Sequence, residues 1–174
     1  MPKIKQLSSQ VVAKIAAGEV IQRPANIVKE LVENSLDAGS TNIKIQLEDG
    51  GLRSLKIIDN GCGMEPDDLQ LCYLPHTTSK ITSEEHLLAL NTFGFRGEAL
   101  NSLTSVSNVQ ISSRTALQDV GTQINLEYGF DTGTSAYGMP IGTQIHVKEL
   151  FHNLPARKKF LKHLRQNLDT FWPP

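Results

Sequence analysis

Hydrophobic residues recur at helical spacing along residues 23–39, RPANIVKELVENSLDAG. Pro24 suits the first turn of a helix, because its missing N–H needs no partner there, and Gly39 suits the position just past the end. One side of this helix is expected to be apolar and to carry Val28, Leu31, Val32, Leu36 and Ala38. The pattern therefore predicts one amphipathic helix, with its remaining face polar.

The polar face of this helix carries Glu30, Asn34 and Asp37, which lie three or four residues apart and so stack along one side. Such a row is most often a solvated surface. Asn34, however, is a poor helix former, because its amide competes for backbone hydrogen bonds. An amide oxygen one turn from a carboxylate can also serve Mg²⁺ and an activated water. The helix alone leaves both interpretations open.

Alternating polarity and turn residues predict the remaining elements. A first helix is expected to be capped by Ser8 or Ser9, and a further helix is expected to begin at Pro66. The expected strands are 42–48, 52–58, 106–113, 121–128 and 142–148, and the first two form a hairpin around the turn at 49–51. Residues 129–140 are expected to form a loop. His146 alternates within a strand, which favours a structural role.

A loop with two glycines, Asp59-Asn60-Gly61-Cys62-Gly63, follows the second strand. Asn-Gly after an apolar run usually indicates a hairpin, but here a helix follows instead of a strand. Gly61 and Gly63 can let a flat ligand approach the backbone, while Asp59 accepts a hydrogen bond from an N–H group of that ligand. A purely structural turn is the alternative.

A second glycine loop, Gly94-Phe95-Arg96-Gly97-Glu98-Ala99-Leu100, runs directly into a helix expected at 98–103. Free N–H groups at a helix start, together with flexible glycines, can hold an anion. Neither a Walker A loop nor a dinucleotide-binding fingerprint is present, so a nucleotide would have to be bound without them. Lys80 lies in a polar loop and could reach a phosphate. The alternative for that loop is the capped start of a helix.

Composition narrows the class of protein. The 174 residues fit one domain, and 39% hydrophobic and 20% charged residues are typical of an ordinary globular protein. The net charge of −1 gives no general attraction to nucleic acid or membrane. The sequence shows neither a signal peptide nor an apolar run of the ~18 residues that a membrane span needs. Cys62 and Cys72 match no metal or redox motif and are expected to be free thiols.

A basic segment near the end of the chain is expected to be helical. It carries Arg157, Lys158, Lys159, Lys162 and Arg165. A solvated face is the simpler interpretation, and a patch that contacts phosphates is the alternative. The chain then reads as cut off rather than complete.

Three stretches, taken in this order, resemble the N-terminal ATPase domain of the MutL mismatch-repair family. They are residues 15–25 (IAAGEVIQRPA), residues 29–39 (KELVENSLDAG) and residues 94–100 (GFRGEAL). The resemblance extends from about Ile4 to Lys162. It implies the Bergerat (GHKL) ATPase fold, which is shared with type II topoisomerases, heat-shock chaperones and sensor histidine kinases. That fold is an α/β sandwich, a mixed β-sheet with helices on one face.

The resemblance also implies roles for single residues. Glu30 would be the general base that activates the attacking water, and Asn34 would supply a side-chain oxygen to Mg²⁺. Asp59 would accept from the adenine amino group of ATP. The other residues implied in nucleotide binding are Gly61 and Gly63 at the pocket, Thr78, Ser79 and Lys80 in the lid, Arg96, Gly97, Glu98, Ala99 and Leu100 around the phosphates, and Thr143 at the adenine end.

The resemblance finally implies a biological setting. Residues 1–174 would be the N-terminal ATPase domain, cut before a second domain that supplies a phosphate-contacting lysine. Slow ATP hydrolysis would drive pairing of two MutL-type subunits, identical or different, with DNA and a MutS-type mismatch-recognition protein as partners. The location would be the cytoplasm of a bacterium or the nucleus of a eukaryote. The rival functions are a nucleotide-sensing module without useful catalysis, another branch such as a topoisomerase ATPase or a kinase, and a DNA-binding domain that uses the basic helix.

Overall fold

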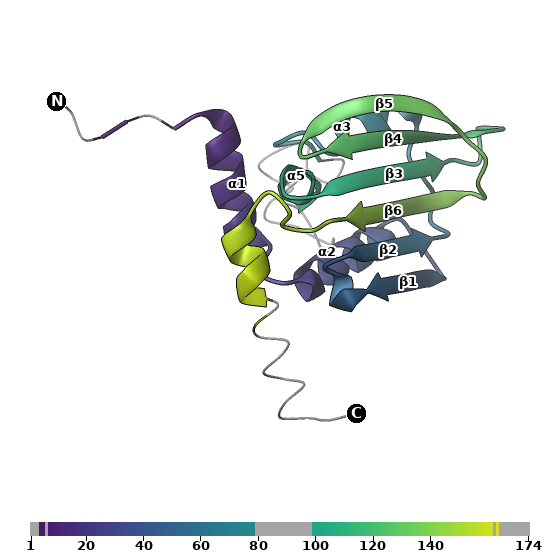
Figure 1. Cartoon of the computed structure of the whole chain (residues 1–174). Coiled ribbons are helices and arrows are strands. Elements are labelled where there is room, and N and C mark those ends of the chain that lie inside the picture. Colours follow the sequence, from purple (N-terminus) through teal and green to yellow (C-terminus); the bar gives the residue numbers. More distant parts are fainter. Residues whose placement is uncertain (1–3, 6, 79–98, 162, 164–174) are drawn as a thin grey trace, which may run out of the picture.

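One β-sheet dominates the protein (Figure 1). The computed structural model describes residues 4, 5, 7–78, 99–161 and 163. Within these residues the sheet has six strands in the order β1-β2-β6-β3-β4-β5. The strands are β1 Ile43–Glu48, β2 Ser54–Asp59, β3 Asn108–Arg114, β4 Gly121–Glu127, β5 Phe130–Tyr137 and β6 Gly142–Lys148.

Each pair of neighbouring strands in this sheet is antiparallel. The expected mixed sheet is therefore corrected in this detail. Strands β2 and β3 do run in the same direction, as a crossover through helices requires, but β6 lies between them and pairs antiparallel with both. Because β6 lies between them, β2 and β3 do not form the parallel pair that a crossover through helices would otherwise allow.

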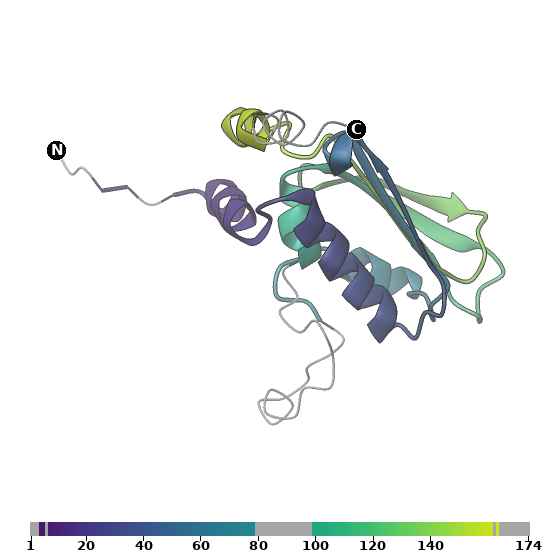
Figure 2. The ribbon, with the colours of Figure 1, turned by 90° about the horizontal axis from the view of Figure 1, so that it is seen from below.

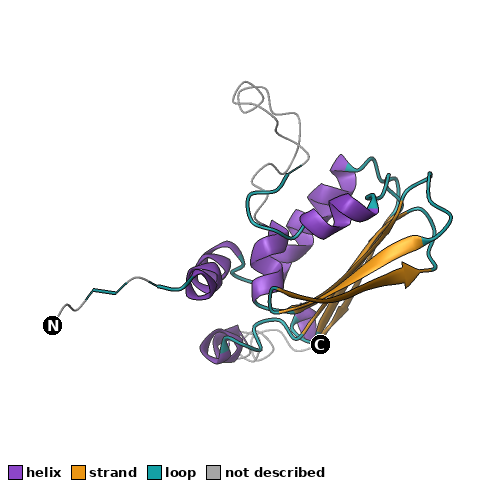
Figure 3. Cartoon of the chain, turned by 90° about the horizontal axis from the view of Figure 1, so that it is seen from above, coloured by secondary structure: helices purple, strands orange, loops and turns teal. Residues whose placement is uncertain are grey.

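Three helices lie on one face of the sheet, which confirms the α/β sandwich (Figures 2 and 3). They are α2 Pro24–Asp37, α3 Pro66–Leu71 and α5 Ala99–Ser105; the other described elements are helix α1 Ser9–Val20 and a short 3-10 turn η1 at Asp49–Gly51. Helix α1 lies beside the sheet, next to the helical residues 155–161 (Figure 1). Among the described residues, no helix has both the length and the apolar character that crossing a membrane requires.

The core lies between the helices and one face of the sheet. A row of isoleucines in register crosses four strands and is buried. It consists of Ile57, Ile145, Ile111 and Ile124. On each of these strands a residue next to the isoleucine points to the opposite face. These neighbours form a polar row of Lys56, His146, Gln110 and Asn125. Burial on one face only is the reason for the alternation seen in the sequence.

Two details of the expected elements were wrong. Residues 129–140, expected as a loop, contain β5, an edge strand exposed along most of its length. An edge strand with two solvated faces lacks the alternation that identifies a strand. In α2 the buried residues are Ile27, Leu31 and Ser35, whereas Leu36 is 46% exposed. The apolar stripe therefore lies about one position away from the expected one.

Candidate functional site

Helix α2 has the ends that its sequence predicts. Pro24 occupies the first turn, and Gly39 follows the helix with a left-handed φ of 74°. Lys29 and Glu33 form an ion pair of 3.3 Å one turn apart, in which the Lys29 side chain is 68% exposed and the Glu33 side chain 18%. Glu33 is therefore paired with Lys29, whereas Glu30, three positions earlier, faces the space between α2 and α5.

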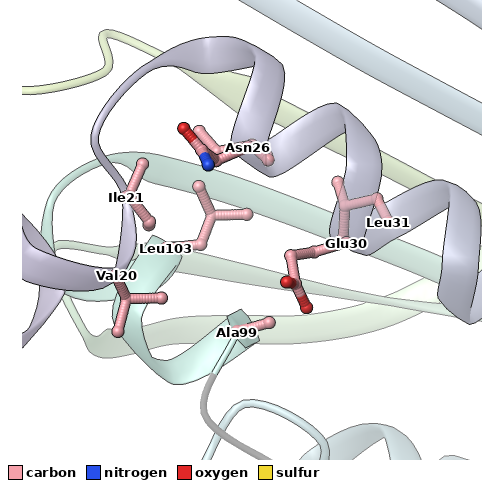
Figure 4. Close-up of a pocket in the computed structure, with 8 residues that line it drawn as sticks. Val20, Ile21, Asn26, Glu30, Leu31, Ala99 and Leu103 are labelled. Carbon is pink, nitrogen blue, oxygen red and sulfur yellow. The ribbon is translucent and has the colours of Figure 1, made fainter. Parts of the chain in front are cut away.

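Glu30 lines a small hollow between α2 and α5 (Figure 4). Its carboxylate is directed toward Ala99, the first residue of α5, and apolar side chains that include Leu31 and Leu103 form the walls. The hollow has a volume of about 10 Å³, close to the smallest space that holds one water molecule. A carboxylate beside a site of this size can accept a proton from a single positioned water.

The carboxylate of Asp59 stands at the end of β2 and is held by three donors. Its Oδ1 accepts from the backbone N–H of Gly61 at 2.9 Å and of Thr143 at 3.2 Å. Its Oδ2 accepts from the hydroxyl of Ser35 at 2.9 Å. These bonds fix the orientation of the carboxylate and leave a lone pair on Oδ2 for a further donor. The arrangement suits the recognition of a ligand N–H group, and this role of Asp59 stays a prediction.

Ser35 joins the two halves of the site, because it lies on α2 directly after Asn34 and bonds to Asp59 on β2. Its side chain is only 3% exposed. The sequence interpretation gave this residue no role. The available signal was its position: Ser35 is four residues after Leu31, so it is a polar residue within the apolar stripe.

The loop after β2 is also attached to the end of α2. Asn60 Oδ1 accepts from the backbone N–H groups of Thr41 and Asn42 at 2.9 and 2.8 Å, and the N–H of Cys62 donates to the Ala38 carbonyl at 3.0 Å. These contacts make the loop a rigid part of the site.

Close packing explains both glycines of this loop. A Cβ added at Gly61 would lie 2.8 Å from the Ala38 Cβ, and one at Gly63 would lie 2.2 Å from the carbonyl oxygen of Arg114. Gly63 also has a left-handed φ of 76°. Both glycines are therefore required by contacts within the protein, and their approach to a ligand stays a prediction.

A second buried serine, Ser113 at the end of β3, connects the loop to β6. Its Oγ accepts from the N–H of Met64 at 2.8 Å and lies 3.1 Å from the Gly142 carbonyl oxygen and 3.0 Å from Thr143 Oγ1. Sequence reasoning missed Ser113 as well. Its signal was again a polar residue in an apolar pattern, two positions after the buried Ile111.

The structure places only part of the predicted phosphate end. Ala99 and Leu100 begin α5, with Ala99 beside Glu30, and Thr78 is exposed. The other predicted residues, Ser79, Lys80, Arg96, Gly97 and Glu98, lie outside the described residues. Within the described ranges no group of three or more His, Cys, Asp or Glu could hold a metal. The predicted Asn34 site would suit Mg²⁺, which takes much of its coordination from phosphates and water.

Three residues outside the site also have defined surroundings. Arg157 donates to the Gln22 carbonyl at 3.1 Å, so this member of the basic segment holds the helix at 155–161 against the chain before α2. Burial raises the pKa of Cys72 to about 12, which keeps its thiol protonated at neutral pH. His146 lies 3.0 Å from the Ser54 hydroxyl, and burial together with Lys148 lowers its pKa.

Comparison with known proteins identifies the class. Residues 22–155 match the family described as histidine kinase-, DNA gyrase B- and HSP90-like ATPases. The match covers most of the chain and includes α2, the Asp59 loop and Thr143. The chain therefore belongs to this ATPase family, and the expected Bergerat fold is confirmed.

Within this family the similarity is to MutL proteins, as predicted. The chain is 49% identical over 165 residues to the DNA mismatch repair protein MutL of Persephonella marina, which covers 95% of this chain and 32% of the relative. It is 50% identical over 167 residues to MutL of Clostridium botulinum, covering 96% and 25%. The chain thus spans about a quarter to a third of these relatives.

Solved structures give the same similarity. The Aquifex aeolicus MutL ATPase domain complexed with ADP is 36% identical with a TM-score of 0.65, covering 81% of this chain and 48% of that one. The N-terminal domain of a DNA repair protein is 34% identical with a TM-score of 0.74, covering 90% and 44%.

Proposed function

We propose that this chain is the nucleotide-binding part of a MutL-type mismatch-repair ATPase, which binds Mg²⁺-ATP and hydrolyses it slowly. The observation that carries the proposal is the direct bond between α2 and the Asp59 loop through Ser35. This bond places the helix that bears Glu30 and Asn34 against the group suited to recognise a base. The name of the Aquifex relative, a MutL ATPase domain complexed with ADP, supports the same ligand.

The proposed chemistry assigns one task to each group. Asp59 accepts from the adenine amino group, and Asn34 gives a side-chain oxygen to Mg²⁺, which neutralises phosphate charge when bound. Glu30 accepts a proton from the water whose oxygen attacks the γ-phosphorus, while the bond from that phosphorus to the β–γ bridging oxygen breaks. The predicted loop residues 96–100 would hold the phosphates with N–H groups at the start of α5.

The wider role rests on the curated relatives. We infer that ATP binding promotes pairing of two MutL-type subunits, and that the complete protein acts on DNA together with a MutS-type protein in the cytoplasm of a bacterium or the nucleus of a eukaryote. The relatives are named DNA mismatch repair proteins, which supports this setting. A nucleotide-sensing module without catalysis is the rival, because this chain spans only part of those relatives.

The experiment compares two carboxylates of the same helix in the complete protein. Glu30→Gln should retain ATP binding and lose about 10²–10⁴-fold in turnover, the usual contribution of a general base. Glu33→Gln is the matched control, since Glu33 pairs with Lys29 and does not line the hollow at Glu30, and it should keep its turnover. ATP binding without turnover in the wild type would favour the sensing module. Equal turnover in both variants would exclude Glu30 as the base.

A further inference from the structure

Three polar residues at the Asp59 end of the site bear on how purine bases are distinguished, which rests on the proposed function. Asp59, Thr143 and Ser113 are each two residues from a member of the buried isoleucine row, and they lie on the same face of the sheet. These three polar residues therefore close the core at one end of the sheet. Ser113 is fully buried and Thr143 is 8% exposed, so Ser113 cannot itself touch a ligand.

The hydrogen atoms in this group can be assigned by counting. The Ser113 hydroxyl has one proton and two lone pairs. One lone pair accepts from the Met64 N–H at 2.8 Å, and the proton is directed to the Gly142 carbonyl at 3.1 Å, which can only accept. The remaining contact, 3.0 Å to Thr143 Oγ1, is then satisfied when Thr143 donates to the second lone pair. This assignment uses every donor and acceptor of Ser113.

We propose that Ser113 is a specificity-determining positioning residue, which engages the Thr143 proton so that the base end of the site offers only acceptors. A Thr143 hydroxyl whose proton points to Ser113 has only lone pairs to offer a ligand. The neighbouring Asp59 carboxylate, held by the Thr143 N–H at 3.2 Å, also only accepts. Such a site favours a purine with an amino group at position 6 and disfavours a 6-oxo purine, whose oxygen would meet acceptors.

The test compares ATP with ITP, which carries a 6-oxo group and lacks the 2-amino group of guanine. Dissociation constants of both nucleotides are measured for the wild type and for Ser113→Ala. Without Ser113, the Thr143 hydroxyl is free to turn and donate. The preference for ATP over ITP should then fall about three- to tenfold, the value of one net hydrogen bond.

Ser112→Ala is the matched control. Ser112 is adjacent on β3 and equally buried, but its hydroxyl donates to Gln123 Oε1 at 3.1 Å on the opposite face of the sheet. It should lose a similar amount of stability and keep the wild-type ratio of ATP to ITP affinity. Should Ser113→Ala fail to fold, Ser113→Cys, which has similar size and is a weak hydrogen-bond donor and acceptor, should show the same narrowed ratio.

The possible results distinguish the role of Ser113 from nucleotide binding itself. An unchanged ratio in folded Ser113→Ala or Ser113→Cys overturns the role of Ser113, as does an equal narrowing in Ser112→Ala. A wild type that binds ATP and ITP equally also overturns it, while ATP binding itself still supports the proposed function. A wild type that binds neither nucleotide refutes the proposed function.

Discussion

The bond between Ser35 and Asp59 should contribute measurably to both folding and binding. Ser35→Ala removes a hydroxyl that is 3% exposed and lies 2.9 Å from Asp59 Oδ2 and 3.0 Å from the Leu31 carbonyl. The Leu31 carbonyl faces position 35 within α2 and keeps its helical backbone partner. The loss therefore falls mainly on the carboxylate of Asp59.

The magnitude follows from these contacts. A hydrogen bond to a charged group contributes about 1.5–3 kcal/mol, and alanine is favoured over serine in a helix by about 0.5 kcal/mol. Ser35→Ala should thus lower the free energy of unfolding by about 1–2.5 kcal/mol. The matched control is Ser105→Ala, another buried helix serine, whose hydroxyl donates only to the Ser102 carbonyl at 2.8 Å. It should cost less than about 1 kcal/mol.

The assay is urea denaturation of the two single variants, of Asp59→Ala, and of the double variant Ser35→Ala/Asp59→Ala. Residues in direct contact should show a coupling of at least about 0.5–1 kcal/mol in this cycle. Ser35→Ala should also weaken ATP binding, because Asp59 loses a donor that fixes its orientation. Additive effects of the two substitutions, or a Ser35→Ala variant as stable as Ser105→Ala, would refute the argument that this bond joins the two halves of the site.

Three further predictions concern other parts of the structure. Gly63→Ala should lower the free energy of unfolding by about 2–5 kcal/mol, because Gly63 has a left-handed φ and an added Cβ would clash with the Arg114 carbonyl on β3. Gly39→Ala, which has a similar φ but open space around it, should lower it by about 1–2 kcal/mol, and equal losses in urea denaturation would contradict the clash. A thiol reagent should label the exposed Cys62 in the native protein and Cys72 only after unfolding, because burial raises the pKa of Cys72 to about 12. Rapid labelling of both thiols in the native protein would show that Cys72 is not protected. In the folded state the pKa of His146 lies below its ordinary value of ~6.5, so the unfolded chain binds more protons and the stability of the protein falls as the pH drops below about 6.5. Between pH 7 and pH 5 the melting temperature of His146→Gln should therefore fall less than that of the wild type. Parallel melting curves for the two proteins would show that His146 does not contribute.

The sequence by itself determined most of the local elements and the family. Pro24 and Gly39 mark the ends of α2, because proline fits a first helical turn and glycine fits a left-handed position, and the structure has both where they were predicted. The resemblance to MutL ATPase domains, based on three short stretches, was confirmed by family and fold. These features are local or rest on short contiguous motifs, so the sequence shows them directly.

The tertiary structure decided which groups meet. The sequence does not show that β6 inserts between β2 and β3, and this insertion brings Thr143 to Asp59 and removes the expected parallel pairing. It also does not show that Ser35 and Ser113 hold the two sides of the site together, although both stand out as polar residues in apolar stripes. Contacts between residues 24 to 84 positions apart depend on the packing of whole elements, and periodicity along one element carries no information about which partner it will face.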